Sequence, residues 1–207
     1  MKQNLGTGTK RILEVGCGCG QLLEPFCGNN ECYGIDISSE QLKRAEAKGY
    51  SIYEQDLETE KLPFTDEYFD VVIFSEVIEH IVNTEHFMNE INRVLCNKGL
   101  SIISFPNVNQ PISWLMTIFL DLPPMYCARS YSPHVRDFTV KLVKKLLKIK
   151  GFRVLQIEGT YVYPFRNTLS KFVARKIPRL GEKIIIVAEK EHEPIPIPFV
   201  IWDIRNL

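Results

Sequence analysis

The stretch that decides the fold is Arg11–Gly20, RILEVGCGCG. Its first five residues form a short apolar run typical of a buried strand. Gly16, Gly18 and Gly20 then allow a tight turn in which backbone N–H groups approach a ligand closely. Apolar residues at helical spacing follow, so we expect a helix over Gln21–Phe26. A strand, a glycine turn and a helix in this order predict an α/β fold with a ligand site at the turn.

Further strands are expected along the chain. Phe69–Ser75 and Leu100–Phe105 are almost continuously apolar, as expected for parallel strands that are buried on both faces. The other expected strands are Cys32–Ile37, Ser51–Gln55, Phe152–Ile157 and Lys183–Ala188. Because helical patterns alternate with the strands, the sequence predicts a mostly parallel sheet with helices on both faces, a doubly wound α/β domain.

Three helices are expected between these strands, each with a recognisable start or end. Ser38 and Gln41 form a capping box, and Thr139 is a good N-terminal cap. Glycine is expected to close each helix. The expected limits are Ser38 to Gly49, a helix with its apolar face over Phe87–Leu95 that ends at Gly99, and Thr139 to Gly151.

Length and composition limit the class of protein. The 207 residues suit one domain, and 45% hydrophobic with 24% charged residues is ordinary for a globular chain. Lys plus Arg (25) balance Asp plus Glu (25), so charge gives no reason to expect a nucleic acid partner. The longest apolar stretch, near Ile112–Leu122, is too short to span a bilayer, and no apolar leader follows the first lysine. We therefore expect a cytoplasmic protein without stable membrane insertion.

The cysteines are interpreted as reduced thiols. None is paired in a CxxC spacing, and two lie inside the glycine loop, so neither a zinc site nor a disulfide framework is predicted. Their positions are Cys17, Cys19, Cys27, Cys32, Cys96 and Cys127.

Asp36 ends the second strand, twenty residues beyond Gly16, where a carboxylate can accept both hydroxyls of an adenosine ribose. Its alternative role is to cap the helix at Ser38, and the glycine loop alone could be an ordinary turn. A dinucleotide loop places glycine three positions after its second glycine, and Gln21 stands there instead. The pattern therefore favours an adenosine ligand over NAD.

Four motifs together resemble those of class I S-adenosylmethionine-dependent methyltransferases of types 11 and 23. They are EVGCGCG at Glu14–Gly20, GID at Gly34–Asp36, QDL at Gln55–Leu57 and FDVVIFSEVIEH at Phe69–His80. The resemblance covers roughly Arg11–Lys190. It implies a Rossmann-like domain with a seven-stranded sheet in the order 3-2-1-4-5-7-6 and an antiparallel strand 7.

The resemblance also implies roles for individual residues. Glu14 would brace the glycine loop beside the methionyl moiety, and Asp36 would hold the ribose. Asp56 and Leu57 would flank the adenine. Ser75 would line the opening for the methyl group. The cofactor-binding set it implies is Glu14, Gly16, Cys17, Gly18, Gly20, Asp36, Ile37, Asp56, Leu57, Ser75 and Glu76.

Within that superfamily the chain looks most similar to the MetW-like branch. The resemblance lies in SFPN at Ser104–Asn107, in Trp114, and in HVRDFT at His134–Thr139. MetW-like proteins are associated with methionine biosynthesis. A non-catalytic partner that binds an adenosyl ligand beside such an enzyme is therefore the alternative to an enzyme.

The candidates for chemistry follow the fourth strand. Glu76, Glu79 and His80 form an E-x-x-E-H cluster, and in a helical turn the two carboxylates would share a face. An oxygen nucleophile must lose its proton, which makes these three residues the catalytic candidates and favours an oxygen acceptor. With His134 they are also the candidates for a divalent metal, in the manner of small-RNA 2′-O-methyltransferases, but we expect a metal-free site because this pair is widespread without metal.

We expect one methyltransferase domain over residues 1–190 and a proline-rich tail over 191–207. An insertion at about 107–133 is expected to cap the pocket of a small-molecule substrate, with extra core or a membrane-touching segment as alternatives. A second, basic amphipathic insertion at about 160–181 could be a solvated helix, a subunit interface or a lipid-headgroup surface. The expected protein partners are a second copy or a metabolic enzyme.

Overall fold

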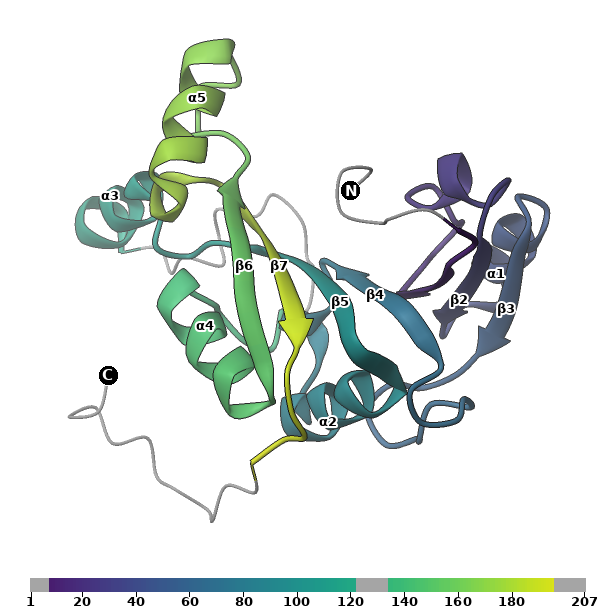
Figure 1. Cartoon of the computed structure of the whole chain (residues 1–207). Coiled ribbons are helices and arrows are strands. Elements are labelled where there is room, and N and C mark those ends of the chain that lie inside the picture. The colour runs from purple at the N-terminus through teal and green to yellow at the C-terminus, as the bar shows by residue number, and fades with distance from the viewer. Residues whose placement is uncertain (1–7, 122–133, 196–207) are drawn as a thin grey trace.

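The computed structural model describes residues 8–121 and 134–195, and these build a seven-stranded sheet in the order β3-β2-β1-β4-β5-β7-β6 (Figure 1). The sheet is parallel except for β7, which pairs antiparallel with both β5 and β6. This confirms the order and the antiparallel strand that the resemblance implied. The strands are β1 (Arg11–Val15), β2 (Glu31–Asp36), β3 (Tyr50–Glu54), β4 (Phe69–Ser75), β5 (Leu95–Pro106), β6 (Phe152–Gly159) and β7 (Lys183–Lys190).

Five α-helices accompany the sheet in the described part of the chain: α1 (Ser39–Glu46), α2 (Thr84–Val94), α3 (Pro111–Leu120), α4 (Val140–Ile149) and α5 (Thr168–Lys176). Alternate residues of the central strands enter two hydrophobic clusters, one on each face. Val72 and Phe74 of β4 belong to the larger cluster with α2 and α4, whereas Val71 and Ile73 pack with α1. α3 and α5 lie beyond the end of the sheet at which β5 ends (Figure 1).

The predicted caps at Ser38 and Thr139 are present, but the capping box is only half formed, because the Ser38 amide donates to Asp36 at 2.9 Å in place of the Gln41 side chain. The Ser38 hydroxyl accepts from the Gln41 amide at 3.4 Å, and the Thr139 hydroxyl accepts from the Leu142 amide at 3.2 Å. Each cap satisfies one of the amides that the first turn of a helix leaves without an internal partner. α1 and α4 therefore begin where the sequence predicts.

Two helix predictions are wrong in their extent. No α-helix covers Gln21–Phe26: the segment forms turns and a single 3-10 turn, Glu24–Phe26. Pro25 would lie inside a helix that begins at Gln21, where it has no amide hydrogen to donate and its ring clashes with the preceding turn, so helical hydrogen bonds cannot propagate. α2 ends at Val94 rather than at Gly99, because the next residue already pairs with β4.

The chain continues past β7 onto its own domain. The Glu191 amide donates to the Gly151 carbonyl at 2.8 Å, and the Ile195 amide donates to the Ile149 carbonyl at 3.0 Å. The rest of the proline-rich tail lies outside the described residues, as does the second half of the 107–133 insertion. Among the helices of residues 8–121 and 134–195, none is long and apolar enough to cross a membrane.

Candidate cofactor and acceptor site

The glycine loop joins β1 to the 3-10 turn in a conformation that favours glycine. Gly16, Gly18 and Gly20 have φ values of +68°, +49° and +67°. A methyl group on Gly16 would lie 2.5 Å from Val77, and one on Gly20 would lie 2.8 Å from the Tyr50 ring. A methyl group on Gly18 would meet nothing within 4 Å. Two of the glycines are therefore required by packing, whereas the third faces open space in which a ligand can approach the backbone.

Asp36 connects this loop to the end of β2. One carboxylate oxygen accepts from the Gly18 amide at 2.8 Å, and the other accepts from the Ser38 amide at 2.9 Å. The capping alternative at Ser38 is therefore present alongside a contact to the loop. Since each carboxylate oxygen can accept two hydrogen bonds, both keep capacity for a further donor such as a ribose hydroxyl.

Glu14 lies beneath the loop and is buried. Its carboxylate accepts from the Tyr50 hydroxyl at 2.9 Å, and that hydroxyl accepts from the Leu23 amide. Burial raises the pKa of Glu14 to about 7. Burial also raises the pKa of the neighbouring Cys17 thiol to about 12, so this cysteine is inert as a nucleophile at neutral pH. Both residues support the loop from inside.

The residues predicted beside the adenine, Asp56 and Leu57, follow β3 at the edge of the sheet where Asp36 ends β2. Ile37 exposes 71% of its side chain directly after β2. The amide of Gln55 donates to the Asp36 carbonyl at 3.1 Å, which brings the QDL motif to the same edge of the sheet. Asp56 is exposed, and Leu57 packs against the larger hydrophobic cluster. An exposed apolar side chain, Ile37, and an exposed carboxylate, Asp56, thus lie near the end of β2.

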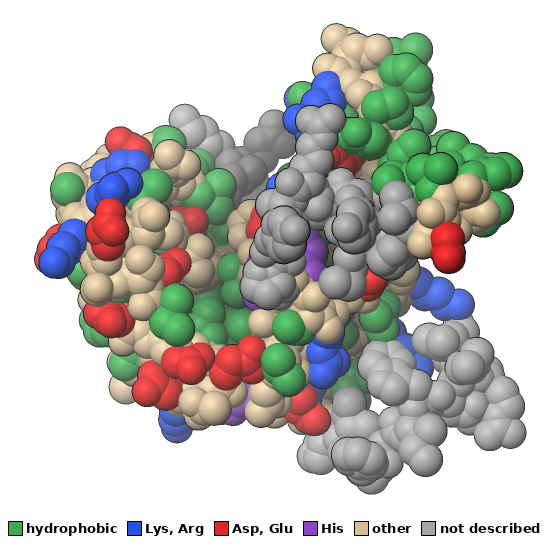
Figure 2. All heavy atoms as spheres, turned by 180° about the vertical axis from the view of Figure 1, so that it is seen from behind, with side chains coloured by type: hydrophobic (Ala, Val, Ile, Leu, Met, Phe, Trp, Pro, Cys, Tyr) green, Lys and Arg blue, Asp and Glu red, His purple; other side chains and the backbone are tan. Residues whose placement is uncertain are grey.

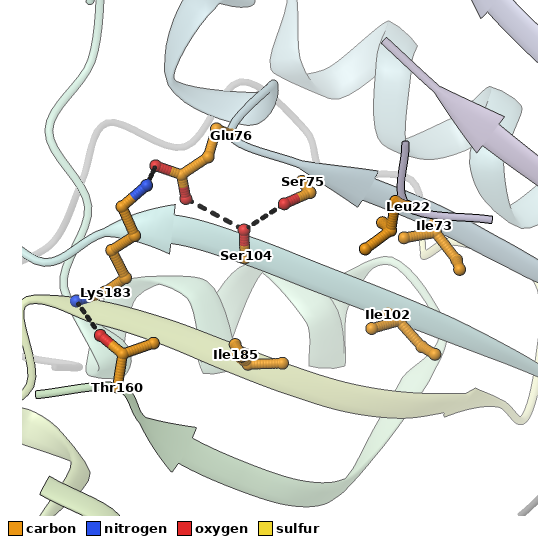
Figure 3. Close-up of a pocket in the computed structure, with 9 residues that line it drawn as sticks. All are labelled: Leu22, Ile73, Ser75, Glu76, Ile102, Ser104, Thr160, Lys183 and Ile185. Atoms are coloured by element: carbon orange, nitrogen blue, oxygen red, sulfur yellow. Dashed lines mark hydrogen bonds and ion pairs between the residues drawn. The ribbon is translucent and has the colours of Figure 1, made fainter. Parts of the chain in front are cut away.

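A cavity of about 270 Å³ opens over the sheet beside the end of β4 (Figure 3). Its floor is apolar and comes from three neighbouring strands, and polar groups gather at one end of it. The lining residues are Leu22, Ile73, Ser75, Glu76, Ile102, Ser104, Thr160, Lys183 and Ile185. The cavity fits a molecule with an apolar body and a polar end.

The polar end of this cavity is one connected group. The hydroxyls of Ser75 and Ser104 lie 2.7 Å apart, and the Ser104 hydroxyl donates to Glu76 at 3.0 Å. The Lys183 ammonium pairs with the other Glu76 oxygen at 2.7 Å (Figure 3). Glu76 itself has a φ of +57°, which a residue with a side chain rarely adopts. The strained backbone aims its carboxylate across β5 toward β7.

Glu79, His80 and His134 form a second group close to the end of β4. Their possible ligand atoms all lie within 4.8 Å of one another, and the two imidazole rings meet edge to face with centroids 4.9 Å apart. Glu79 is only 1% exposed, and neither of its carboxylate oxygens has a hydrogen-bond partner among the described residues. Burial raises the pKa of Glu79 to about 7, and the nearby Glu76 charge adds to the shift.

The backbone places His134 in this group. The amides of Val135 and Arg136 both donate to the Glu79 carbonyl, at 2.9 and 3.2 Å, and so hold the incoming segment against the turn after β4. Burial, followed by the neighbouring His80, lowers the pKa of His134. At neutral pH its imidazole is therefore uncharged, with a nitrogen lone pair available.

The structure separates the E-x-x-E-H motif that the sequence suggests as one cluster. Only Ile78–His80 forms a helical turn, and it is a 3-10 turn. Glu76 precedes it in the left-handed conformation, so the expectation that Glu76 and Glu79 share a helical face is wrong. Glu76 faces the cavity and Lys183, whereas Glu79 and His80 face His134.

Sequence analysis missed Ser104 as a site residue, and it also missed Lys183 and Thr160. Ser104 could have been found, because it is the next-to-last residue of the fifth predicted strand and lies opposite Ser75, near the edge where ligands of parallel sheets bind. Lys183 had no such indicator. It reaches the cavity only because β7 pairs antiparallel with β5 in a register that sets Lys183 opposite Pro106.

Comparison with known proteins shows what these features are similar to. Residues 13–103 match the family described as Methyltransferase domain. A ubiquinone biosynthesis O-methyltransferase of a Ruegeria species is 35% identical over 114 residues, which is 53% of this chain and 46% of that protein. An uncharacterised protein of Methanocaldococcus jannaschii is 33% identical over 153 residues, 74% of this chain and 59% of its own length. The chain thus spans about half the length of these curated relatives.

Solved structures share the fold over nearly the whole chain. A putative methyltransferase of Bacillus halodurans aligns with a TM-score of 0.68 at 21% identity, covering 93% of this chain and 97% of that one. A possible histamine N-methyltransferase of Thermotoga maritima aligns with a TM-score of 0.67 at 19% identity, covering 92% and 85%. Taken with the strand order, these matches show that the chain has the fold of S-adenosylmethionine-dependent methyltransferases and that its first half is similar to the Methyltransferase domain family.

Proposed function

We propose that this chain transfers a methyl group from S-adenosylmethionine to a small molecule, and that the acceptor atom is oxygen. The observation that carries the choice of oxygen is Glu79, a buried carboxylate without a hydrogen-bond partner among the described residues, beside two imidazoles. A hydroxyl acceptor must give up its proton, and this group is arranged to take one.

The residues around the glycine loop fit the cofactor. The open side of Gly18 leaves room for a ligand against the backbone, and the Asp36 oxygens can accept two more donors. In this proposal Gly16, Cys17, Gly18 and Gly20 contact the methionyl part over the buried Glu14. Asp36 and Ile37 hold the ribose, and Asp56 and Leu57 flank the adenine. When bound, S-adenosylmethionine supplies an activated methyl group on a good leaving group.

The acceptor lies in the cavity of about 270 Å³. Its apolar body contacts the floor formed by Ile73, Ile102 and Ile185, and its polar end faces Ser75 and Glu76. The protein accelerates transfer mainly by holding the acceptor oxygen in line with the methyl group in a site that excludes water.

Glu79 and His80 do not line the cavity, so in this proposal the acceptor hydroxyl extends past Glu76 to the group of Glu79, His80 and His134 and gives its proton to Glu79 or His80. A pKa of about 7 matches the proton affinity that a general base needs at neutral pH, and the neutral His134 imidazole can accept a hydrogen bond from the protonated partner. Glu76 acts differently: its ion pair with Lys183 orients the acceptor end of the cavity.

Calorimetric titration with S-adenosylhomocysteine tests the cofactor half of the proposal. Wild type should bind one molecule saturably. Asp36→Ala should weaken binding by about 10- to 100-fold, since a hydrogen bond to a charged group contributes about 1.5–3 kcal/mol. Gly18→Ala should also weaken it by filling the open side of the loop. Glu40→Ala, an exposed carboxylate on α1, is the control and should bind as wild type. A folded wild type that does not bind would sink the proposal.

A hydroxyl-compound panel with labelled methyl donor tests the acceptor half. Transfer to a phenol or alcohol that is lost in Glu79→Gln and His80→Ala supports the base. Tight cofactor binding without turnover on any acceptor would instead favour the MetW-like alternative, a partner of a methionine-biosynthesis enzyme. Turnover that a chelator abolishes and Mg²⁺ restores would assign Glu79, His80 and His134 to a metal rather than to a base.

A further inference from the structure

Helices α3 and α5 bury small side chains and expose large apolar ones. The buried residue of α3 is Ser113, and those of α5 are Ser170 and Ala174. α3 exposes Ile118 and Phe119 by 73% and 74%, and α5 exposes Leu169 by 70% and Phe172 by 58%. A helix that packs on the core of its own domain shows the reverse arrangement. The other exposed apolar residues of these two insertions are Trp114, Leu115, Leu120, Phe165 and Ile177.

The two helices form one surface, which we call the α3–α5 face. Figure 1 places both helices beyond the same end of the sheet, and Figure 2 shows their hydrophobic side chains in one green area at the top right. Asn107, at the root of α3, donates to the carbonyls of Arg179 and Gly181, both at 2.9 Å. This buried side chain joins the two insertions at their base. An exposed apolar area of this kind marks an interaction site.

The charges within the α5 segment are cationic, whereas α3 carries no cation and ends at the carboxylate of its C-cap, Asp121. No carboxylate occurs between Gly159 and Glu182, and none between Asn107 and Leu120. Two cations of the α5 segment form ion pairs with carboxylates that flank this segment: Arg166 pairs with Glu182, and Arg175 pairs with Glu158. The full set of cations is Arg166, Lys171, Arg175, Lys176 and Arg179.

The two lysines stay close to the apolar side chains. The Lys171 ammonium lies 6.0 Å from the centre of the Tyr161 ring, and the Lys176 ammonium lies 5.9 Å from that of Phe172. Their hydrocarbon stems can therefore cover apolar surface while the charged ends stay at its border.

From this combination we infer that the α3–α5 face docks on the surface of a lipid bilayer that carries anionic headgroups. Exposed Leu, Phe and Trp flanked by Lys and Arg are typical of helices that lie in the membrane interface. A second copy of the chain fits less well. In a two-fold symmetric pair the same patch meets itself, so the cationic borders of two copies would come close together, and Asp121 is the one carboxylate of the described α3 segment beside them.

Co-sedimentation of the full chain with vesicles tests this inference. Binding is expected to phosphatidylcholine mixed with phosphatidylglycerol, to be much weaker to phosphatidylcholine alone, and to fall with salt. Replacing Lys171 and Lys176 by Gln should lower the partition coefficient by about 30-fold, since each lysine near such a surface contributes about fivefold. Changing Leu169 and Phe172 to Ser should abolish binding. Lys144→Gln with Lys148→Gln, on the exposed side of α4, is the matched control and should bind as wild type.

Each contrary outcome has a definite meaning. Equal binding to both kinds of vesicle, no binding at all, or full binding by the Leu169 and Phe172 variant would overturn the inference. Because the exchanged side chains are exposed, the variants should unfold at the wild-type temperature, which is checked first. If gel filtration shows a wild-type dimer that the Leu169 and Phe172 variant converts to a monomer, and no vesicle is bound, the face joins two copies instead.

Discussion

At the scale of single residues, Glu79 carries the clearest electrostatic consequence. Burial raises its pKa from an ordinary 4.5 to about 7 in the folded protein. Between these two pH values the folded state holds a proton that the unfolded state has lost. The stabilisation is therefore fully present below about pH 4.5 and is lost as the pH rises through 7. Glu14, whose pKa is raised to about 7 by its own burial, acts in the same direction.

Glu79→Gln should therefore raise the free energy of unfolding at pH 8 by about 1–3 kcal/mol, because an amide avoids the cost of a buried charge. The stability of the variant should also fall less between pH 5 and pH 8 than that of wild type. Urea unfolding at both pH values measures this. Glu40→Gln, on the exposed face of α1, is the control and should change neither value by more than about 0.5 kcal/mol. A variant that is no more stable at pH 8 would contradict the burial of this carboxylate.

The site residues that could be predicted are those whose role depends on local spacing. Asp36 and the glycines follow adjacent strands, and parallel strands bring their carboxyl ends to one edge whatever the rest of the chain does. Lys183 depends on the register of an antiparallel strand, and Glu76 depends on one left-handed backbone conformation. Neither feature leaves a periodic pattern in the sequence.

At the scale of elements, Asn107 holds the two insertions together. It is 1% exposed, its amide group donates to two carbonyls at the end of the second insertion, and its own backbone amide donates to the Glu182 carbonyl at 3.0 Å. It also turns the chain toward α3, because its side-chain oxygen accepts from the Asn109 amide. One side chain thus fixes where α3 leaves the sheet and where α5 returns to it.

We expect Asn107→Ala to lower the free energy of unfolding by about 2–3 kcal/mol, because it leaves one buried and one partly buried carbonyl without this donor. Hydrogen exchange should speed up at residues 179–182 and leave β1 unchanged. Asn109→Ala is the comparison: among the described residues its half-buried side chain accepts a hydrogen bond only from the Trp114 indole, so the loss should stay below about 1 kcal/mol. Equal losses in the two variants would show that Asn107 has no special role.

The elements themselves were predicted unevenly, for physical reasons. Continuous apolar runs located β4 and the core of β5, since strands buried on both faces need no polar residue. Capping residues located the starts of α1 and α4. The segment after Gly20 has helical spacing too, but Pro25 inside it has no amide hydrogen to donate and interrupts the helical hydrogen bonds. Leu95 completes the apolar face of α2 in the sequence but pairs with Phe69 as a strand residue.

At the scale of the whole molecule, the two ends of the parallel strands differ in function. The candidate site lies at their carboxyl ends. At their amino ends, buried lysines connect the last strand, β7, to neighbouring elements. Lys190 is 3% exposed, and its ammonium donates to the carbonyls of Asn92 and Leu95 at 2.9 and 3.1 Å. It also pairs with Glu193 at 3.2 Å. Stability and ligand binding should therefore respond to mutation separately.

Lys190→Ala should lower the free energy of unfolding by about 2–4 kcal/mol, since it leaves buried carbonyls unpaired and opens a cavity. The affinity for S-adenosylhomocysteine should stay within about twofold of wild type, because the site lies at the other end of the parallel strands. Chemical unfolding and calorimetric titration measure the two quantities. Lys148→Ala, an exposed lysine on α4, should alter neither. A large loss of affinity in a folded Lys190 variant would contradict this separation.

The two ends of the β6–β7 connection, which carries α5, are joined by hydrogen bonds beside the sheet. Thr160 and Lys183 exchange hydrogen bonds there, at 3.0 and 3.3 Å, and the Glu182 amide donates to the Tyr161 carbonyl just above. Lys183 is thus held in the cavity by bonds that do not depend on the segment between Tyr161 and Glu182. That segment, which carries α5, can therefore be exchanged for another loop without displacing Lys183 from the candidate site.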